Sequence, residues 1–300
     1  MSSSAPARWL PLDKAADFTS HDLVALARKR LGLRRIGHTG TLDPDATGVL
    51  VLALGKATRL IQYLPGGKSY RAVIRLGLET DSYDASGQVL AEAPVPELTL
   101  AELEALLEDF SGPQQQIPPM VSAISIQGQR LYQLARQGIE VERPPRAVHF
   151  YRLDVLKWES PYLEIDIDCS AGTYIRSLAH DLGARLGCGG SLAQLRRTRA
   201  HGFGLGQTLR LEALQALSEA PEPGLAADWP LQALPALTLP DQAAVLRLRQ
   251  GQPVADTDLP EDELLRIYSP EGEFAALGQS RAGAVWPKLL LLDPVLSKQT

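Results

Sequence analysis

The sequence contains few of the residues that build disulfide scaffolds or metal sites. Its 300 residues include only two cysteines, Cys169 and Cys188, which form no C-x-x-C pair, and five scattered histidines. Zinc sites need closely spaced ligands, and disulfide-rich folds need many paired cysteines. We therefore expect a protein of the reducing cytoplasm that holds no metal.

Long apolar runs are missing as well. No run approaches the ~18 residues of a membrane helix, and the first residues, MSSSAPARWLPLD, lack the apolar segment of a signal peptide. The sequence therefore predicts no association with a membrane. Its 45% apolar and 22% charged residues are ordinary for a globular protein, and its length is sufficient for two domains.

Positive and negative charges are concentrated in different segments. The net charge of −5 disfavours nucleic acid as a partner, but residues 28–35, RKRLGLRR, carry five positive charges and residues 196–199, RRTR, carry three. Residues 79–110 contain nine acidic residues and no basic one. A local basic segment can bind phosphates on a protein that is acidic overall, although solvated helix ends would produce the same pattern.

Hydrophobic periodicity predicts both helices and strands. Helical spacing is found in residues 19–32, where Ser20 is the expected N-cap, in residues 99–112, and after the sequence SAGT at 170–173. Short apolar or alternating segments predict strands at residues 49–54, 68–77 and 162–170.

Two proline-rich segments interrupt this pattern. Residues 113–146 contain five prolines and are expected to leave the core as an insertion that is not part of the sheet. Residues 219–240 contain five prolines, and we interpret them as a linker to a small C-terminal module with strand-like segments.

Residues 37–48, GHTGTLDPDATG, are too polar and too rich in glycine for a helix or a half-buried strand. An Asp-Pro turn would explain Asp43 by itself, but not the composition of the whole loop. Glycines let a backbone approach a ligand, and the buried strand predicted at residues 49–54 would hold the loop still. Functional sites are built on loops supported in this way.

Two common explanations of such a loop do not fit. A phosphate-binding loop would need glycine in place of Leu50 and serine or threonine in place of Ala57, and the glycines do not match G-x-G-x-x-G. A metal held by His38, Asp43 and Asp45 would lack a further ligand.

Four sequence blocks, taken together and in order, resemble the TruB-type tRNA pseudouridine synthases. They begin GHTGTLDPDATG at residue 37, KSYRAVIRLG at 68, QIPPMVSA at 116 and CSAGTYIRSL at 169. The resemblance is close over residues 10–205. The C-terminal sequences RQGQPV and IYSPEGEFAALG are more loosely similar to the PUA-type RNA-binding domain.

One departure lies near the start of the chain. The family pattern D-K-P-x-G-x-[ST]-S is DKAADFTS here, so that Lys14 is kept but Ala15 and Asp17 replace the proline and the glycine. Asp adopts left-handed backbone angles more readily than most residues. The departure concerns the local turn and not the residues assigned to the chemistry.

The resemblance implies an α+β pseudouridine-synthase fold with a mixed, largely antiparallel sheet flanked by helices and loops. It implies a catalytic domain at residues 1–230, a thumb-like insertion at 113–146 that contacts RNA, and a small β-rich PUA-like domain at 235–300. The implied activity is conversion of uridine 55, in the T-loop of tRNA, to pseudouridine on a flipped-out base. This reaction needs no cofactor, metal or guide RNA, and we expect a monomer that binds the T-arm.

The resemblance also assigns site residues. Asp43 takes the place of the catalytic nucleophile, Tyr70 can stack on the base and is a candidate proton acceptor, and Arg176 can pair with Asp43 through two hydrogen bonds. The residues that would bind the RNA are His38, Tyr174, Leu195, Arg136, Arg143 and Arg146. The basic segments at 28–35 and 196–199 would hold phosphates.

Two alternatives belong to other classes. A non-catalytic RNA-binding protein, such as a tRNA folding chaperone, could keep the same scaffold, but the intact set of Asp43, Tyr70 and Arg176 argues against it. An RNA-guided relative of the dyskerin type is the other alternative, and the PPMVSA and LYQLARQG sequences of the insertion favour the stand-alone bacterial form.

Overall fold

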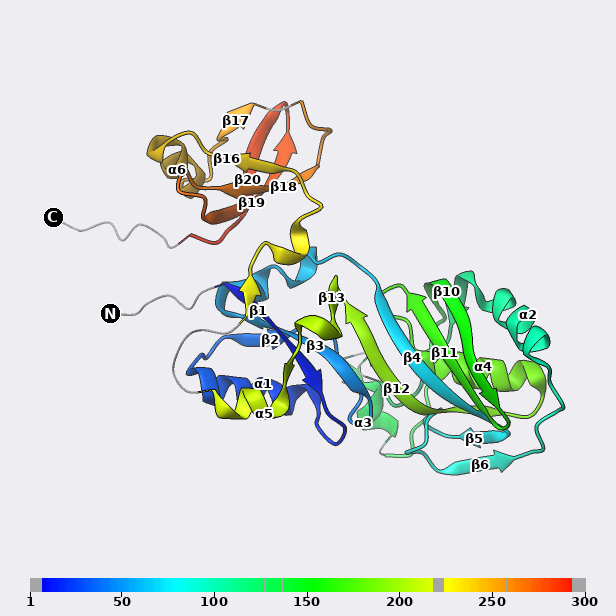
Figure 1. Cartoon of the computed structure of the whole chain (residues 1–300). Helices are drawn as coiled ribbons and strands as arrows, with labels where there is room; N and C mark the ends of the chain where they lie inside the picture. Colours follow the sequence, from blue (N-terminus) through cyan, green and yellow to red (C-terminus); the bar gives the residue numbers. More distant parts are fainter. Residues whose placement is uncertain are drawn as a thin grey trace.

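The computed structural model describes residues 7–292, except for 123, 127, 136, 218–223 and 257. A long sheet with helices packed on it forms the main body, and a small β-rich domain lies to one side of it (Figure 1). None of the helices in the described ranges has the length and apolar character needed to cross a bilayer.

The main sheet is mixed and largely antiparallel, as expected. Its central path runs β14–β1–β3–β12–β4–β11–β10–β7, and only the β1–β14 and β3–β12 pairs along this path are parallel. Three short strands pair at its sides: β2 with β3, β13 with β12 and β15 with β1. The strands are β1 (Arg8–Lys14), β2 (Ile36–His38), β3 (Thr47–Leu54), β4 (Lys68–Leu76), β7 (Gly112–Gln116), β10 (Arg146–Glu159), β11 (Tyr162–Cys169), β12 (Gly190–Ala200), β13 (Phe203–Gly204), β14 (Leu209–Arg210) and β15 (Leu225–Ala226).

Strand β12 joins two halves of this sheet. It pairs with β4 along most of its length, and on its other edge two residues pair with β3, Arg196 with Thr47 and Arg197 with Gly48. Three-residue β2 and eight-residue β3 flank the polar loop at residues 39–46, and the strand after the loop was predicted from the sequence. The loop therefore lies where the two halves of the sheet meet.

Helices cover each half of the sheet with a separate apolar core. Helices α1 (Ser20–Leu31) and α5 (Leu211–Ala216) pack on β1–β3, and helices α2 (Leu100–Phe110) and α4 (Ile175–Leu186) pack on β4, β10 and β11. The N-cap of α1 is Thr19 and not Ser20, because the Thr19 side chain accepts from the Asp22 backbone N–H. Helix α2 begins in a capping box, in which Thr99 accepts from the Glu102 backbone N–H and Glu102 accepts from the Thr99 backbone N–H.

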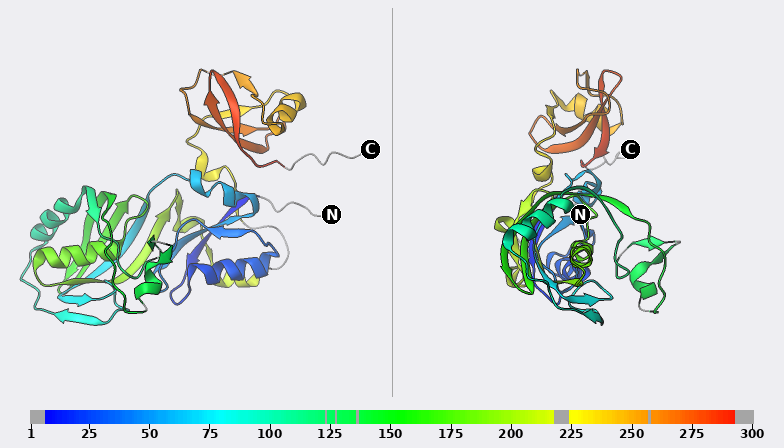
Figure 2. Two further views of the ribbon diagram at one scale, coloured as in Figure 1. Left: turned by 180° about the vertical axis from the view of Figure 1, so that it is seen from behind. Right: turned by 90° about the vertical axis from the view of Figure 1, so that its right-hand side faces the viewer.

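The insertion departs in part from the prediction. Residues 112–116 form β7 and pair with the start of β10, so this part of the proline-rich segment belongs to the sheet. The rest contains β8 (Ser125–Ile126), β9 (Gln129–Arg130) and α3 (Leu131–Ala135), which stand away from the main body in the right-hand view of Figure 2. Pro113 fits within β7 because this is an edge strand of the sheet, where a residue without an N–H is tolerated.

The C-terminal domain has its own sheet, in the order β16–β18–β19–β20–β17, and its own apolar core. Its elements are β16 (Ala236–Thr238), α6 (Gln242–Arg249), β17 (Ala255–Asp256), β18 (Leu264–Tyr268), β19 (Phe274–Arg281) and β20 (Ala284–Leu290). The predicted linker at 219–240 is wrong in part, because residues 225–226 pair with β1 and residues 236–238 form β16. The domain boundary at 230–235 stays a prediction.

The remaining short elements connect these parts. A small hairpin, β5–β6, extends from the end of β4, and 3-10 turns follow β3 and β13 and precede β16. These elements are η1 (Gly55–Arg59), η2 (Ile61–Tyr63), β5 (Leu78–Thr80), β6 (Val89–Glu92), η3 (Leu205–Gln207) and η4 (Trp229–Leu231).

Candidate active site

A cavity of about 240 Å³ opens where the two halves of the sheet meet. Five of the residues assigned by resemblance line it, although they come from four separate parts of the chain: Asp43, Tyr70, Tyr174, Arg176 and Leu195. The other residues of its wall are Thr41, Leu42, Lys68, Ser122, Gly172, Thr173 and Ile175. The fold thus brings the central part of the expected site together.

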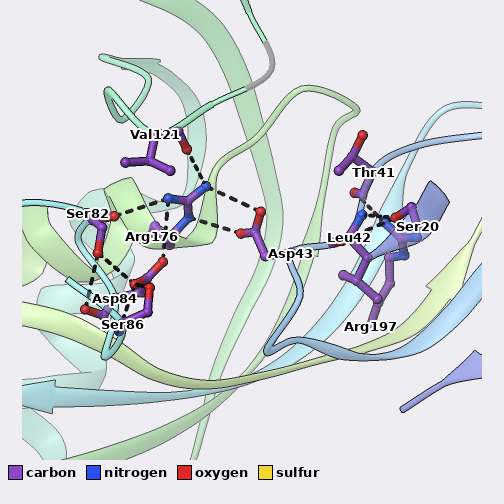
Figure 3. A network of polar contacts seen from close by, with 10 residues as sticks. All are labelled: Ser20, Thr41, Leu42, Asp43, Ser82, Asp84, Ser86, Val121, Arg176 and Arg197. Atoms are coloured by element: carbon purple, nitrogen blue, oxygen red, sulfur yellow. Dashed lines mark hydrogen bonds and ion pairs between the residues drawn. The ribbon is translucent and has the colours of Figure 1, made fainter. Parts of the chain in front are cut away.

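Asp43 and Arg176 form a two-point ion pair at this cavity (Figure 3). Arg176 Nε lies 3.1 Å from Asp43 Oδ2, and Arg176 Nη2 lies 3.4 Å from Asp43 Oδ1. The arginine side chain is only 5% exposed, whereas that of Asp43 is 41% exposed. The guanidinium is therefore fixed inside the protein, and the carboxylate remains accessible from the cavity.

The same guanidinium has further partners that hold it in place. Arg176 Nη1 lies 3.5 Å from Asp84 Oδ2 and donates to the Ser82 carbonyl at 3.2 Å, and Nη2 donates to the Val121 carbonyl at 2.8 Å. Asp84 accepts in turn from the Ser82 and Ser86 side chains. Arg176 is thus held by the loop after β5 and by the insertion at the same time.

Asp84 is a residue that the sequence interpretation missed. It lies in the sequence TDSYDASG, which contributed to the family resemblance but received no role. Its polarity and its glycine looked like an ordinary turn, and nothing in the local pattern indicates a partner 92 residues further along the chain.

Burial raises the pKa of Asp43 above its ordinary value, and the neighbouring Asp84 and Asp45 charges act in the same direction. The Arg176 guanidinium opposes this shift, because it stabilises the ionised carboxylate. A partly desolvated carboxylate is a stronger nucleophile than one surrounded by water, and its cationic partner keeps it available in the ionised form.

Tyr70 lies on β4 and is almost fully buried. Burial raises its pKa to about 12, so the side chain is a neutral phenol at physiological pH. Tyr174 precedes α4, and Gln116 of β7 binds both its backbone N–H and its carbonyl, at 3.0 and 3.1 Å. The base of the insertion is therefore attached to the start of the helix that carries Arg176.

Side chains from elsewhere in the fold hold the backbone of the Asp43 loop. Each of them places a polar atom within hydrogen-bonding distance of a loop carbonyl oxygen. The contacts are His201 with Thr39 at 3.3 Å, Arg197 with Gly40 and Thr41 at 3.2 Å, Ser20 with Leu42 at 3.2 Å, and Lys14 with Pro44 at 2.7 Å. The loop is thus fixed without using the Asp43 side chain.

The basic segment at 196–199 is part of this support, which corrects one expectation. Arg197 is only 1% exposed, and its guanidinium donates to the carbonyls of Gly40, Thr41 and Val49. Arg196 pairs with Asp13 at 2.8 Å. Arg197 is therefore not available to a phosphate.

The atypical sequence DKAADFTS has a left-handed residue within it. Asp17 has a left-handed backbone with φ of +66°, so an aspartate occupies the position where the family pattern has glycine. Lys14, in the same segment, is fully buried and donates to the Pro44 and Ala15 carbonyls. The departure from the family pattern leaves the Asp43 loop supported.

The other predicted RNA contacts lie outside the cavity wall. His38 is half-buried at the end of β2, packs edge-on against His21, and has a buried Nδ1 without a partner in the described ranges. Arg143 donates to the Pro118 carbonyl and pairs with Glu140, so it supports the insertion from inside. Arg146 is exposed at the start of β10. Arg136 lies outside the described residues.

Comparisons with known proteins agree with this fold. Residues 28–175 match the TruB family pseudouridylate synthase N-terminal domain, residues 176–244 the tRNA pseudouridylate synthase B C-terminal domain, and residues 235–291 the C-terminal domain of pseudouridine synthase II TruB. Among solved structures, a chain of a Cbf5–Nop10–Gar1 complex superposes with a TM-score of 0.70 at 26% identity, covering 96% of this chain and 85% of that one.

Curated relatives match along nearly the whole chain. A tRNA pseudouridine synthase B from a Synechococcus species is 50% identical over 289 residues, which cover 94% of this chain and 97% of the relative. The protein of the same name from Trichormus variabilis is 43% identical over 295 residues, covering 96% and 99%. The fold and these matches define a pseudouridine-forming enzyme, and the chain belongs to the TruB family of pseudouridylate synthases.

Proposed function

We propose that the protein converts the uridine at position 55, in the T-loop of tRNA, into pseudouridine, with Asp43 as the nucleophile. Its relatives from Synechococcus and Trichormus are tRNA pseudouridine synthases B. The observation that carries the proposal is the accessible Asp43 carboxylate held by a buried Arg176 at the wall of a cavity. Cytoplasmic location, a monomeric state and independence from guide RNA, cofactor and metal stay predictions.

The reaction is an isomerisation with no redox change. The bond between the sugar C1′ and the base N1 breaks, the uracil turns, and C5 bonds to C1′; the proton leaves C5, and N1 ends the reaction protonated. In this scheme Asp43 attacks the nucleoside and is released at the end. Arg176 orients the carboxylate and favours its ionised form before the attack.

The cavity supplies the walls that keep the detached uracil in place. We assign Tyr70 to stacking on the base, which contributes ~1–3 kcal/mol and offsets part of the cost of flipping the nucleotide out of its stack. Because its pKa is raised to about 12, Tyr70 would have to lose its own proton before it could accept another. Tyr174 and Leu195 complete the wall.

RNA binding outside the cavity is assigned to the insertion and to His38. Arg146 is exposed beside the base of the insertion and is a candidate for a phosphate of the T-arm. Arg136 and Arg143 are proposed for the same role, although Arg143 would first have to exchange its internal contacts. His38 would contact the RNA next to the flipped nucleotide.

Tritium release from a tRNA transcript containing 5-tritiated uridine tests the proposal, because C5 loses its hydrogen only when it bonds to C1′. One site per transcript should release tritium, and the release should persist with excess metal chelator provided that the RNA stays folded. A matched transcript with cytidine at position 55 should release none. Release from that transcript, or none from either, would contradict the assignment.

A further inference from the structure

Lys68, the first residue of β4, brings a positive charge to the active-site cavity. It lies two residues before Tyr70 on the same strand, so both side chains are on the same face, and both line the cavity. Within the described part of the chain, no hydrogen bond or ion pair involves its Nζ atom. The mechanism derived above does not use it.

The ammonium of Lys68 lies beside the loop that carries Asp43. A Cβ atom added to Gly40 would come within 2.9 Å of Lys68 Nζ and 3.5 Å of Lys68 Cε. The ammonium therefore lies against the bare backbone of this glycine, three residues before Asp43.

The groups around Lys68 do not neutralise its charge. The pKa of Lys68 is lowered to about 8, mainly by burial and next by the positive charge of Arg197 on β12. Cys169 of β11 acts weakly in the opposite sense, but burial raises the pKa of its thiol to about 11, so it is neutral. The charge of Lys68 in turn lowers the pKa of His38 and His201, which burial already lowers.

The two carboxylates described at the site are already paired with a cation. Asp43 and Asp84 both pair with Arg176. Holding a largely desolvated cation next to another cation costs free energy unless an anion completes the site. The arrangement therefore suits an anionic ligand that arrives from the cavity.

We propose that Lys68 binds a backbone phosphate of the RNA adjacent to the flipped uridine. This inference rests on the proposed function, since it names a contact of the same substrate in the same site. Every flipped nucleotide is flanked by two phosphodiesters, which the rotation of the backbone brings to the pocket. An ammonium is a compact point charge with three donors and is well suited to a phosphate oxygen.

A double-substitution cycle tests this contact. The RNA is a T-arm stem-loop with a neutral methylphosphonate in place of one phosphodiester, either 5′ or 3′ of the target uridine, and the protein variant is Lys68→Met. At one of the two linkages, the methylphosphonate and Lys68→Met should each raise Kd about tenfold, and the two together should raise it no further than either one. Lys68→Met should also reduce the slope of log Kd against log salt by about 0.7–0.9.

Matched controls separate this result from a general loss of charge. Lys68→Arg keeps a cation and should retain most of the affinity. Lys157→Met removes an exposed lysine that pairs with Glu159 and does not line the cavity. In this variant the methylphosphonate should still raise Kd about tenfold, as it does in the unchanged protein. If the effect of Lys68→Met on Kd adds in full to that of the methylphosphonate at both linkages, the proposal is overturned. The uracil carbonyls would then be the partner of Lys68.

A measurement on the unchanged protein covers the case in which Lys68→Met does not fold. The preference for the phosphodiester over the methylphosphonate should decline from pH 7 to pH 9, because the Lys68 ammonium loses its proton near pH 8. Lys14 has a similar pKa, but it donates to the Pro44 and Ala15 carbonyls, so its titration affects both RNAs alike. A preference that does not change with pH would count against Lys68.

The same experiments distinguish the two proposals. Pseudouridine formed by the unchanged protein, with no coupling at Lys68, would reject the phosphate contact alone. No pseudouridine from any stem-loop or tRNA would reject the proposed function itself.

Discussion

Asp43 and Arg176 are 133 residues apart in the sequence and meet through two contacts, of 3.1 and 3.4 Å. Asp43 belongs to the loop between β2 and β3, and Arg176 to the first turn of α4 on the other half of the sheet. The backbone of Asp43 does not depend on Arg176 for its position, because Arg197, Lys14 and other groups hold the loop. Substitution of Asp43 can therefore test its chemistry without destroying the site.

Asp43→Asn should abolish pseudouridine formation and leave tRNA affinity nearly unchanged. Asn is nearly isosteric and can still form the turn, but it cannot act as a carboxylate nucleophile, and phosphate contacts dominate affinity. Asp45→Asn is the control, because Asp45 is exposed in the same loop and has no ion pair in the described ranges. Pseudouridine yield and tRNA Kd at one salt concentration are the measurements, and an active Asp43→Asn would refute the assignment.

Asp84→Asn should slow the reaction about 10- to 100-fold at saturating RNA without abolishing it. The substitution removes one charged partner of Arg176, and hydrogen bonds to charged groups contribute about 1.5–3 kcal/mol. The remaining contacts with Asp43, Ser82 and Val121 would still hold the guanidinium near its place. Single-turnover rates with enzyme in excess measure the effect, and a rate equal to that of the unchanged protein would show that Asp84 has no positioning role.

The single-turnover rate should fall on the acidic side at a pH above the ordinary range of an aspartate. The reactive form is the ionised Asp43, and burial raises the pKa of this carboxyl, so protonation begins at higher pH than in an exposed aspartate. The single-turnover rate should therefore be maximal above the raised pKa of Asp43 and decline as the pH falls through that pKa. Kd measured at each pH separates this effect from weaker binding, and an unchanged rate down to pH 4 would contradict the prediction.

Gly48→Ala should lower the free energy of unfolding by about 3 kcal/mol or more. Gly48 has φ of +100°, and a Cβ there would lie 2.2 Å from the Arg197 carbonyl oxygen, so the β3–β12 contact would have to open. Gly32→Ala is the matched control: φ is +63°, no atom lies within 4 Å of the added Cβ, and a cost of about 1 kcal/mol is expected. Urea unfolding of both variants gives the comparison, and equal losses would show that the close approach is unimportant.

The local elements could be predicted from the sequence because their signals are local. The capping box of Thr99 with Glu102 and the left-handed Gly32 after α1 are formed by neighbouring residues, and the alternation in β11 is visible within eight positions. Strand β7 and the ordered residues 225–238 were missed because their pairing partners lie far away in the chain.

The candidate site was predicted through the family resemblance and not from spacing. The roles assigned to Asp43, Tyr70 and Arg176 came from matching motifs, and the fold brings these residues to one cavity. Asp84 and Lys68 were missed, since their significance depends on which groups surround them in space. Arg197 shows the opposite error, because its basic neighbours suggested an RNA contact while its guanidinium is buried under the loop.

The position of β12 in the sheet has a consequence for the order in which the protein folds during synthesis. Strands β1 and β3 are made first, and β4, β10 and β11 follow, yet the strand that lies between β3 and β4 is completed only at Ala200. Until β12 is inserted, the loop of Asp43 and the strand of Tyr70 belong to separate, unjoined sheet edges. Pairings this distant in sequence form slowly and leave strand edges open in the meantime, so a nascent chain is exposed to aggregation until β12 is inserted.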